Sequence, residues 1–337
     1  MNARERVWAA LHGESPDRPP VSFWGHQYDR ESSAADLAGA AVEAQRRFGW
    51  DWVKLNPRKH YHVEPWGVSY RYAGGRTVKP LLESWPIHRV EDWSGITPRA
   101  HDAGALGEQI EAVRLARATL PADVPLIETV FTPLAILAEM TESTEELRGH
   151  MRTDADRVRG ALEAVTSTFE KLVPSLLEAG AEGIFLATVD WGSLRLLSPG
   201  EYREWCRPYD LRLLEAARGA PFNVLHVCKS RNLLLELADY PVAAFSWDAL
   251  DPTNPGLATA LHHLRGAAMG GISFDASLAT ADPKRFAAEY ARALEATGGR
   301  RWLAAPGCSI PPATAAENLE AVRAAALSTR LKETPLP

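Results

Sequence analysis

The sequence predicts an α/β fold, specifically a (β/α)8 barrel of the TIM type that forms a single domain over residues 1–337. About eight short apolar runs, rich in β-branched and aromatic residues, alternate with longer stretches of helical period. This alternation is typical of repeated βα units and a parallel sheet. A length of 337 residues suits one such barrel with an insertion. An open, doubly wound sheet is the alternative architecture.

The apolar runs are the predicted strands. In chain order they cover residues 21–24, 52–55, 126–130, 183–188, 223–227, 243–247, 267–272 and 302–305. Between residue 67 and about residue 96 the chain is rich in Tyr, Gly, Pro and Trp and has no helical period. We therefore expect an insertion after the second strand, with a hairpin around Gly74-Gly75.

Composition and charge limit the classes of function. The chain is 46% hydrophobic and 24% charged, which excludes a disordered or fibrous protein. A formal net charge of -6 and an isoelectric point near 6.0 provide no basic surface for phosphate backbones, so we expect no nucleic-acid partner. No apolar run approaches the roughly 20 residues that cross a bilayer. The first residues predict an amphipathic helix instead of a signal core, so we expect a cytoplasmic protein with no membrane partner.

Three residues predict a metal site. His226 and Cys228 are two apart on a predicted strand, so their side chains point to the same face, and Cys308 follows the last predicted strand. One imidazole and two thiolates leave one tetrahedral position open, which is typical of catalytic zinc. Buried cysteines and hydrogen-bonded histidines are also common in cores, so these residues could simply pack. The third cysteine, Cys206, lies in a predicted helix and is expected to be a plain thiol.

Other polar residues follow the predicted strands and are expected at the end of the barrel where active sites of this fold lie. Asp248, Asp190 and His26 are the candidate catalytic residues. Asp248 is the first candidate for a fourth, displaceable zinc ligand, and Glu128, Asp190 and His26 come after it. Asn56 is a candidate substrate-binding residue, and so is Arg58.

Several aromatic residues are candidates for contacts with a substrate. Trp24, Trp191 and Trp247 lie at or just beyond strand ends on the same side, where they could stack on a flat macrocycle or enclose a methyl-bearing cation. They could equally fill a wide barrel mouth. His60-Tyr61-His62 suggests a second metal site, but alternating loop histidines more often contact solvent or backbone, which is what we expect here.

Three segments carry a resemblance to a known family. They are Pro16-Asp17-Arg18-Pro19-Pro20-Val21 after the opening helix, Gly49-Trp50-Asp51 before the second strand, and Ala305-Pro306-Gly307-Cys308 before the closing helix. With these segments the sequence resembles the uroporphyrinogen decarboxylase superfamily across nearly the whole chain. The resemblance implies the same barrel. It also implies one of two chemistries, since the superfamily contains porphyrinogen decarboxylases and cobamide-dependent methyltransferases.

Motifs at the first two strands separate these chemistries. The decarboxylases carry Arg-Gln-Ala-Gly-Arg after the first strand, whose arginines hold substrate carboxylates, and Phe-Ser-Asp at the second, whose aspartate binds pyrrole N–H groups. The corresponding places here read Trp24-Gly25-His26-Gln27-Tyr28-Asp29-Arg30 and Lys54-Leu55-Asn56-Pro57-Arg58. The electrostatic basis of that decarboxylation is therefore missing. His226-x-Cys228 and Cys308 instead match the zinc motif of the methyltransferases, such as those acting on coenzyme M, although the stretch 56–62 departs from the coenzyme M enzymes.

The resemblance implies a zinc-dependent methyltransferase that moves a methyl group between a corrinoid and a small-molecule thiol or other methylated substrate. Its cofactors would be zinc and methylcobalamin. Because the chain shows no cobalamin-binding domain, we expect the corrinoid on a separate carrier protein. One alternative is a decarboxylase of uroporphyrinogen or a related tetrapyrrole, in which Arg30, Arg58 and Lys59 replace the missing arginines. Another is a non-catalytic corrinoid- or tetrapyrrole-binding protein with structural zinc, a site that four protein ligands would close.

Overall fold

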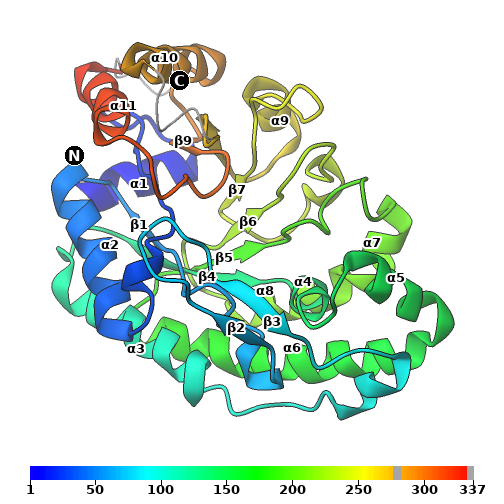
Figure 1. Ribbon diagram of the computed structural model, residues 1–337. Helices are drawn as coiled ribbons and strands as arrows, with labels where there is room; N and C mark the ends of the chain where they lie inside the picture. Colours follow the sequence, from blue (N-terminus) through cyan, green and yellow to red (C-terminus); the bar gives the residue numbers. More distant parts are fainter. Residues whose placement is uncertain (276–281, 332–337) are drawn as a thin grey trace.

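A computed structural model describes residues 1–275 and 282–331. In the described chain, seven parallel strands form a curled sheet in the order β1-β4-β5-β6-β7-β8-β9, with helices around it (Figure 1). The strands are Val53–Leu55 (β1), Leu126–Phe131 (β4), Ile184–Ala187 (β5), Val224–His226 (β6), Ala244–Ser246 (β7), Ala267–Ile272 (β8) and Trp302–Pro306 (β9). Each begins and ends within one residue of a predicted strand. The predicted α/β fold of the TIM type is confirmed.

The eighth strand position, between β9 and β1, is filled by the extended segment 20–25. Val21 forms an isolated parallel bridge with Ala304 of β9, and Gly25 forms a second one with Ile310. In Figure 1 this blue segment accordingly runs beside the orange segment that contains β9. The prediction of a regular strand at residues 21–24 is wrong, although the segment occupies the predicted place.

Side chains explain why this segment is irregular. On the β1 side, the Val21 N–H donates to the Asp51 carboxylate at 2.8 Å, and the Ser22 hydroxyl donates to the Trp52 carbonyl at 2.7 Å. Together with the Asp51 N–H, which donates to the Val21 carbonyl at 2.9 Å, these bonds take the place of a regular backbone ladder. The two prolines before Val21 have no N–H to contribute to such a ladder. Closure of the barrel therefore depends on Asp51 as well as on strand pairing.

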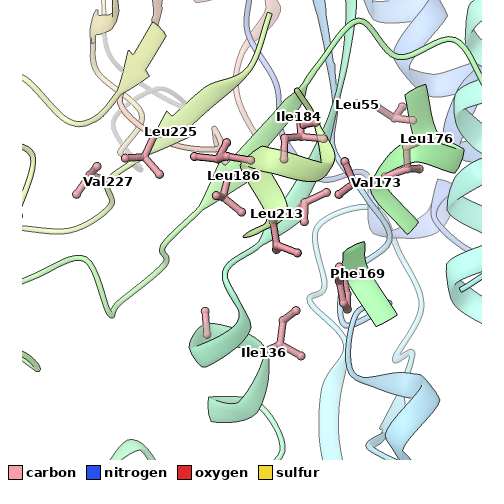
Figure 2. Packing of buried hydrophobic residues seen from close by; sticks show 14 of the residues in the cluster. Leu55, Ile136, Phe169, Val173, Leu176, Ile184, Leu186, Leu213, Leu225 and Val227 are labelled. Atoms are coloured by element: carbon pink, nitrogen blue, oxygen red, sulfur yellow. The ribbon is translucent and has the colours of Figure 1, made fainter. Parts of the chain in front are cut away.

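Helices surround the sheet, and all but α1 lie outside the barrel (Figure 1). They are Ala3–His12 (α1), Ala34–Phe48 (α2), Gly104–Thr119 (α3), Pro133–Ala138 (α4), Thr144–Thr153 (α5), Ala155–Glu178 (α6), Pro199–Trp205 (α7), Arg207–Ala216 (α8), Leu257–His263 (α9), Pro283–Thr297 (α10) and Ala316–Ser328 (α11). In Figure 2, Val173 and Leu176 of α6 lie near Leu55 and Ile184, and Leu213 of α8 lies near Leu186. Phe169, Leu225 and Val227 belong to the same apolar cluster. None of the described helices is both long and apolar enough to cross a membrane.

The interior of the barrel holds a second apolar cluster. Because side chains alternate along a strand, residues between the outward-facing ones, such as Phe185, point inside. Helix α1 contributes Val7 and Leu11 to this cluster, and the Trp8 ring packs edge-on against Phe222, which precedes β6. Helix α1 therefore closes the amino ends of the strands. The carboxyl ends remain available for a site.

The predicted insertion after the second strand is present. Between β1 and β4, strand Ser69–Arg71 (β2) pairs antiparallel with Leu81–Ser84 (β3). Gly74 and Gly75 lie in the connection with φ of 84° and 87°, a left-handed conformation that glycine adopts without strain. The predicted hairpin is confirmed.

Candidate metal centre

His226, Cys228 and Cys308 converge at the carboxyl ends of β6 and β9. Their metal-binding atoms, one imidazole nitrogen and two sulfurs, all lie within 4.8 Å of one another. The two sulfurs are 3.7 Å apart. Two sulfurs bound to a tetrahedral zinc at about 2.3 Å would be about 3.8 Å apart. Among the described residues, this is the group of His, Cys, Asp and Glu side chains that could hold a metal ion.

The strand pattern brings these side chains together. Strand β6 ends at His226, and the next residue, Val227, keeps the strand alternation because its N–H donates to the Ser246 carbonyl of β7 at 2.8 Å. Val227 belongs to the apolar cluster between sheet and helices, so His226 and Cys228 point inward. Cys308 follows β9 by two residues.

Hydrogen bonds orient the His226 ring and favour a thiolate at Cys308, as metal binding requires. The Nδ1 atom of His226 lies 3.1 Å from the Ser246 hydroxyl, which leaves Nε2 as the ligand atom, and the ring stacks on Phe185. The Cys228 thiol beside it lowers the pKa of Cys308 well below its usual range, and the same contact raises the pKa of Cys228. Cys308 is therefore the first of the two to become a thiolate, which is the form that binds metals.

A cavity of about 130 Å³ adjoins the three residues. Trp24, Phe131 and Phe185 form much of its apolar wall, and Lys54 and Asn56 contribute polar groups. A second cavity of about 260 Å³ lies beside helix α2, and the two share part of their walls, including Lys54 and Asn56. The candidate metal centre thus lies at the end of a small, largely apolar pocket.

A family model described as uroporphyrinogen decarboxylase (URO-D) matches residues 2–328. The chain belongs to the uroporphyrinogen decarboxylase family. This confirms the resemblance that the sequence motifs indicated. Relatives of this chain include enzymes of two kinds, methyltransferases and decarboxylases.

The extent of similarity differs between these two kinds. The chain is 24% identical to the methylcobamide:CoM methyltransferase MtaA of Methanosarcina barkeri over 340 residues, which covers 96% of each protein. It is 26% identical to the uroporphyrinogen decarboxylase of Geobacter sp. (strain M21) over 180 residues, which is 52% of this chain and 50% of that enzyme. A solved methyltransferase from Methanosarcina mazei has a TM-score of 0.79 at 22% identity, over 96% of this chain and 98% of the other. The likeness to this solved structure shows that the two proteins share a fold.

Four of the candidate residues line the cavity: His26, a candidate catalytic residue, and the candidate substrate-binding residues Trp24, Asn56 and Arg58. The His26 Nδ1 lies 2.7 Å from the Glu31 carboxylate, and burial lowers the pKa of His26. This imidazole is therefore held in one orientation by a carboxylate, as in acid–base pairs. The Arg58 guanidinium already pairs with the carboxylates of Glu64 and Glu108.

Asp248 and Asp190 do not join the group of metal donors. The Asp248 carboxylate accepts the Leu250 N–H at 3.0 Å, and burial raises the pKa of Asp248. Its backbone packs against Gly307, where a Cβ would lie 2.8 Å from the Asp248 Cα, so glycine is needed beside Cys308. The Asp190 side chain is 49% exposed and pairs with Lys229 at 3.3 Å, outside the cavity wall.

Trp191, Trp247 and Glu128 also lie outside the cavity. Both tryptophans are buried in the core between sheet and helices, and the Trp247 indole N–H donates to the Pro255 carbonyl at 2.7 Å. They pack in the wall of the barrel and neither line the cavity nor fill the barrel mouth. Glu128 pairs in register with Leu55, whose side chain points to the helices (Figure 2), so Glu128 is on the outer face too. Burial raises the pKa of Glu128 well above its usual range.

Lys54 is the main cavity residue that sequence reasoning did not assign. It is 5% exposed, and its Nζ lies 4.8 Å from the Phe185 ring centre. A signal was present in the sequence, because a lysine in a short apolar strand between two buried residues must point into the barrel. Phe131 was missed as well, since it ends β4 without a distinguishing pattern.

The His60-Tyr61-His62 segment differs from its prediction. Both histidines are buried, and they bond to one carboxylate: Glu139 Oε2 is 2.9 Å from His60 Nδ1 and 3.2 Å from His62 Nε2. Lys59 Nζ is 3.2 Å from the other carboxylate oxygen. The expectation of solvent or backbone contacts is wrong, because Glu139, at the end of α4, approaches from 77 or more positions away along the chain.

Proposed function

We propose that this protein is a zinc-dependent methyltransferase that moves a methyl group between a corrinoid and a small-molecule thiol. The observation that carries the proposal is the group of one imidazole and two sulfurs at the end of a small pocket. Three protein ligands leave one position of a tetrahedral zinc for a substrate, whereas structural zinc is closed by four. The similarity to a methylcobamide:CoM methyltransferase over 96% of the chain supports the same reaction class.

The roles of the residues follow from their positions. His226, Cys228 and Cys308 would hold the ion, and the Ser246 hydroxyl would keep the His226 ring oriented. Zinc, when bound, would act as a Lewis acid that lowers the pKa of a substrate thiol. Trp24, Phe131 and the other aromatic residues of the wall would exclude water from the reacting sulfur.

In the proposed reaction, the methyl carbon forms a bond to the substrate sulfur while its bond to the corrinoid cobalt breaks. The electron pair of the broken bond stays on cobalt, and the thiol proton passes to solvent. The corrinoid would be presented over the pocket by a carrier protein. All three cysteines are free, which agrees with our proposal of a cytoplasmic enzyme.

Thiol-dependent loss of the corrinoid methyl group is the test of this function. With methylcobalamin or a methylated corrinoid protein, we expect demethylation, followed by absorbance, only when a suitable thiol is added. Because the thiol pKa would be lowered at the metal, the catalysed rate should persist below the roughly 8.5 pKa of a free thiol. Zinc X-ray absorption should then detect one additional sulfur neighbour. If no thiol in a broad panel stimulates demethylation or alters the zinc signal, the proposal fails.

A second prediction concerns the decarboxylase alternative. We expect no appreciable conversion of uroporphyrinogen III to coproporphyrinogen III, measured by chromatography of the oxidised porphyrins. Arg58 already pairs with Glu64 and Glu108 at 3.0 Å each, so it has little charge to offer substrate carboxylates. The pocket of about 130 Å³ is also small beside the 300–1,000 Å³ typical of drug-sized ligands. Decarboxylation that survives Cys308→Ser but not Arg58→Ala would favour the alternative.

A further inference from the structure

Asp210 is a buried carboxylate outside the barrel. It lies in the first turn of α8 and does not line the cavity at the candidate metal centre. Its Oδ2 accepts hydrogen bonds from the Tyr202 hydroxyl at 2.8 Å and from the Tyr240 hydroxyl at 3.1 Å. Its Oδ1 is buried too and has no hydrogen-bond partner among the described residues. The ion pairs within 4.0 Å in the described chain do not include Asp210, although a buried charge normally has a counter-charge.

The hydrogen bonds of Asp210 join three elements of the fold. The carboxylate on α8 accepts from one phenol of α7 and from another in the connection between β6 and β7, residues 229–243. In the described chain, hydrogen bonds attach this connection to α8 through Tyr240 and through the pair of Arg207 with Asp239. The Asp239 side chain is 63% exposed, and surface pairs of this kind contribute little to stability. The bond to Asp210 is therefore the buried attachment of the connection to the helix.

Burial decides the charge of this carboxyl. It raises the pKa of Asp210 to about 7, although the two phenol hydrogen bonds and the positive charge of Arg207 oppose the shift. Tyr202, Tyr240 and Cys206 lie around the carboxyl, and burial raises the pKa of each above its usual range. These three groups therefore stay neutral at physiological pH, and Arg207 stays positive. Within this cluster, the carboxyl is the group whose charge changes near neutral pH.

Helix α6 also packs against α8, and its charged groups have other partners. The Glu163 and Glu170 carboxylates both accept hydrogen bonds from the Arg212 guanidinium of α8, at 2.6 Å and 2.8 Å. Arg159 donates to Glu204 of α7. The charges that α6 brings to this side of the barrel are thus used at the surface. They leave the buried carboxyl to the two phenols.

We propose that Asp210 is a pH-sensitive latch, whose neutral carboxyl holds the connection 229–243 against α7 and α8 and whose ionisation loosens it. Water stabilises a carboxylate, and opening of the connection would bring water to the unpartnered Oδ1, so the charged form favours the open state. The connection begins directly after Cys228, so the latch affects how firmly the chain beyond this cysteine is held. This inference is independent of the proposed function, since it requires neither a metal nor a corrinoid.

Urea unfolding of the full chain at a series of pH values tests the latch. In the unfolded protein Asp210 loses its proton near about pH 3.9, whereas in the folded protein it keeps the proton until about pH 7. The contribution of Asp210 to stability is therefore largest at acidic pH and falls as the pH rises. Relative to Asp210→Asn, which cannot ionise, the unfolding equilibrium constant of the unaltered protein should rise about tenfold per pH unit between about 4 and 6 and level off above about 7. An identical pH dependence of the two proteins overturns the proposal.

Hydrogen exchange measured by mass spectrometry locates the effect in the chain. After correction for the intrinsic effect of pH on exchange, protection of residues 229–243 should fall about tenfold between about pH 6 and pH 8 in the unaltered protein and stay constant in Asp210→Asn. Tyr240→Phe removes one of the two phenols that oppose the effect of burial, so ionisation should move to higher pH, a shift that a purely structural role would not produce. Asp156→Asn, in the first turn of α6 with a side chain 98% exposed, is the matched control that should behave like the unaltered protein. Protection of 229–243 that is independent of pH in the unaltered protein also overturns the proposal.

Discussion

Replacing Cys308 with serine is expected to remove most of the zinc from the protein and to abolish thiol-dependent demethylation of a corrinoid. The Cys228 thiol lowers the pKa of Cys308, so Cys308 more readily forms the thiolate that binds a metal. Losing one of three ligands should weaken zinc affinity by more than about 100-fold, since even changes to residues that support ligands cost 10- to 100-fold. The measurement is zinc per chain by mass spectrometry after gel filtration. The same result is expected for His226→Ala.

The controls separate a lost ligand from a lost fold. Cys308 lies two residues after β9 and is only half-buried, so circular dichroism and the unfolding midpoint of the zinc-free variant should match those of zinc-free unaltered protein. Cys206→Ala removes the buried cysteine at the junction of α7 and α8 and should keep about one zinc per chain. Full zinc occupancy in both Cys308→Ser and His226→Ala would refute the assignment of the site.

Replacing Asp51 with alanine is expected to destabilise the barrel by about 3–5 kcal/mol, the cost of breaking a buried ion pair from one side. The Asp51 carboxylate accepts from Arg6 at 2.8 Å, from Arg18 at 2.7 and 3.0 Å, and from the Val21 N–H. All three side chains are buried. Without Asp51, the Arg18 guanidinium loses its carboxylate partner inside the protein, and Arg6 keeps only Asp17 of its two carboxylate partners. The segment at the eighth strand position also loses one of its links to the β1 side.

Urea unfolding measures this effect as a change in the free energy of unfolding. The matched control is Asp239→Ala, because Asp239 forms a similar two-bond pair with Arg207 but its side chain is 63% exposed. That surface pair should contribute at most about 1 kcal/mol. Similar losses for the two variants would mean that Asp51 does not close the barrel in the way its contacts indicate.

Buried ion pairs connect two of the sequence segments that suggested the family. Asp17 and Arg18 come from the first of those segments and Asp51 from the second, and Arg6 of α1 bonds to both aspartates. No sequence pattern of strand or helix could indicate that these residues meet. The motifs pointed to the family, whereas their contacts explain why a barrel with an irregular eighth strand holds together.

A position at the end of a strand was not enough to predict which side chains line the cavity. Asp190 and Trp191 come after β5 ends at Ala187, where the chain turns and strand alternation no longer tells where a side chain points. Trp247 is different, because Ser246 contacts His226 inside the barrel, so alternation places Trp247 outside. The prediction that assigned it to the pocket used its position at a strand end and neglected its register.

The sequence by itself determined seven strand positions, the insertion with its hairpin, and the three residues of the candidate metal centre. Each of these depends on a local period, a turn residue or a spacing of two along a strand, all of which can be counted in the chain. Only the tertiary structure decided which charges are balanced. Glu139 reaches His60 and Lys59 from a later helix, Arg58 finds Glu108 on α3, and Lys54 is left with an amide. Ion pairing depends on distance in space between residues far apart in sequence, and burial then sets how much each unbalanced charge costs.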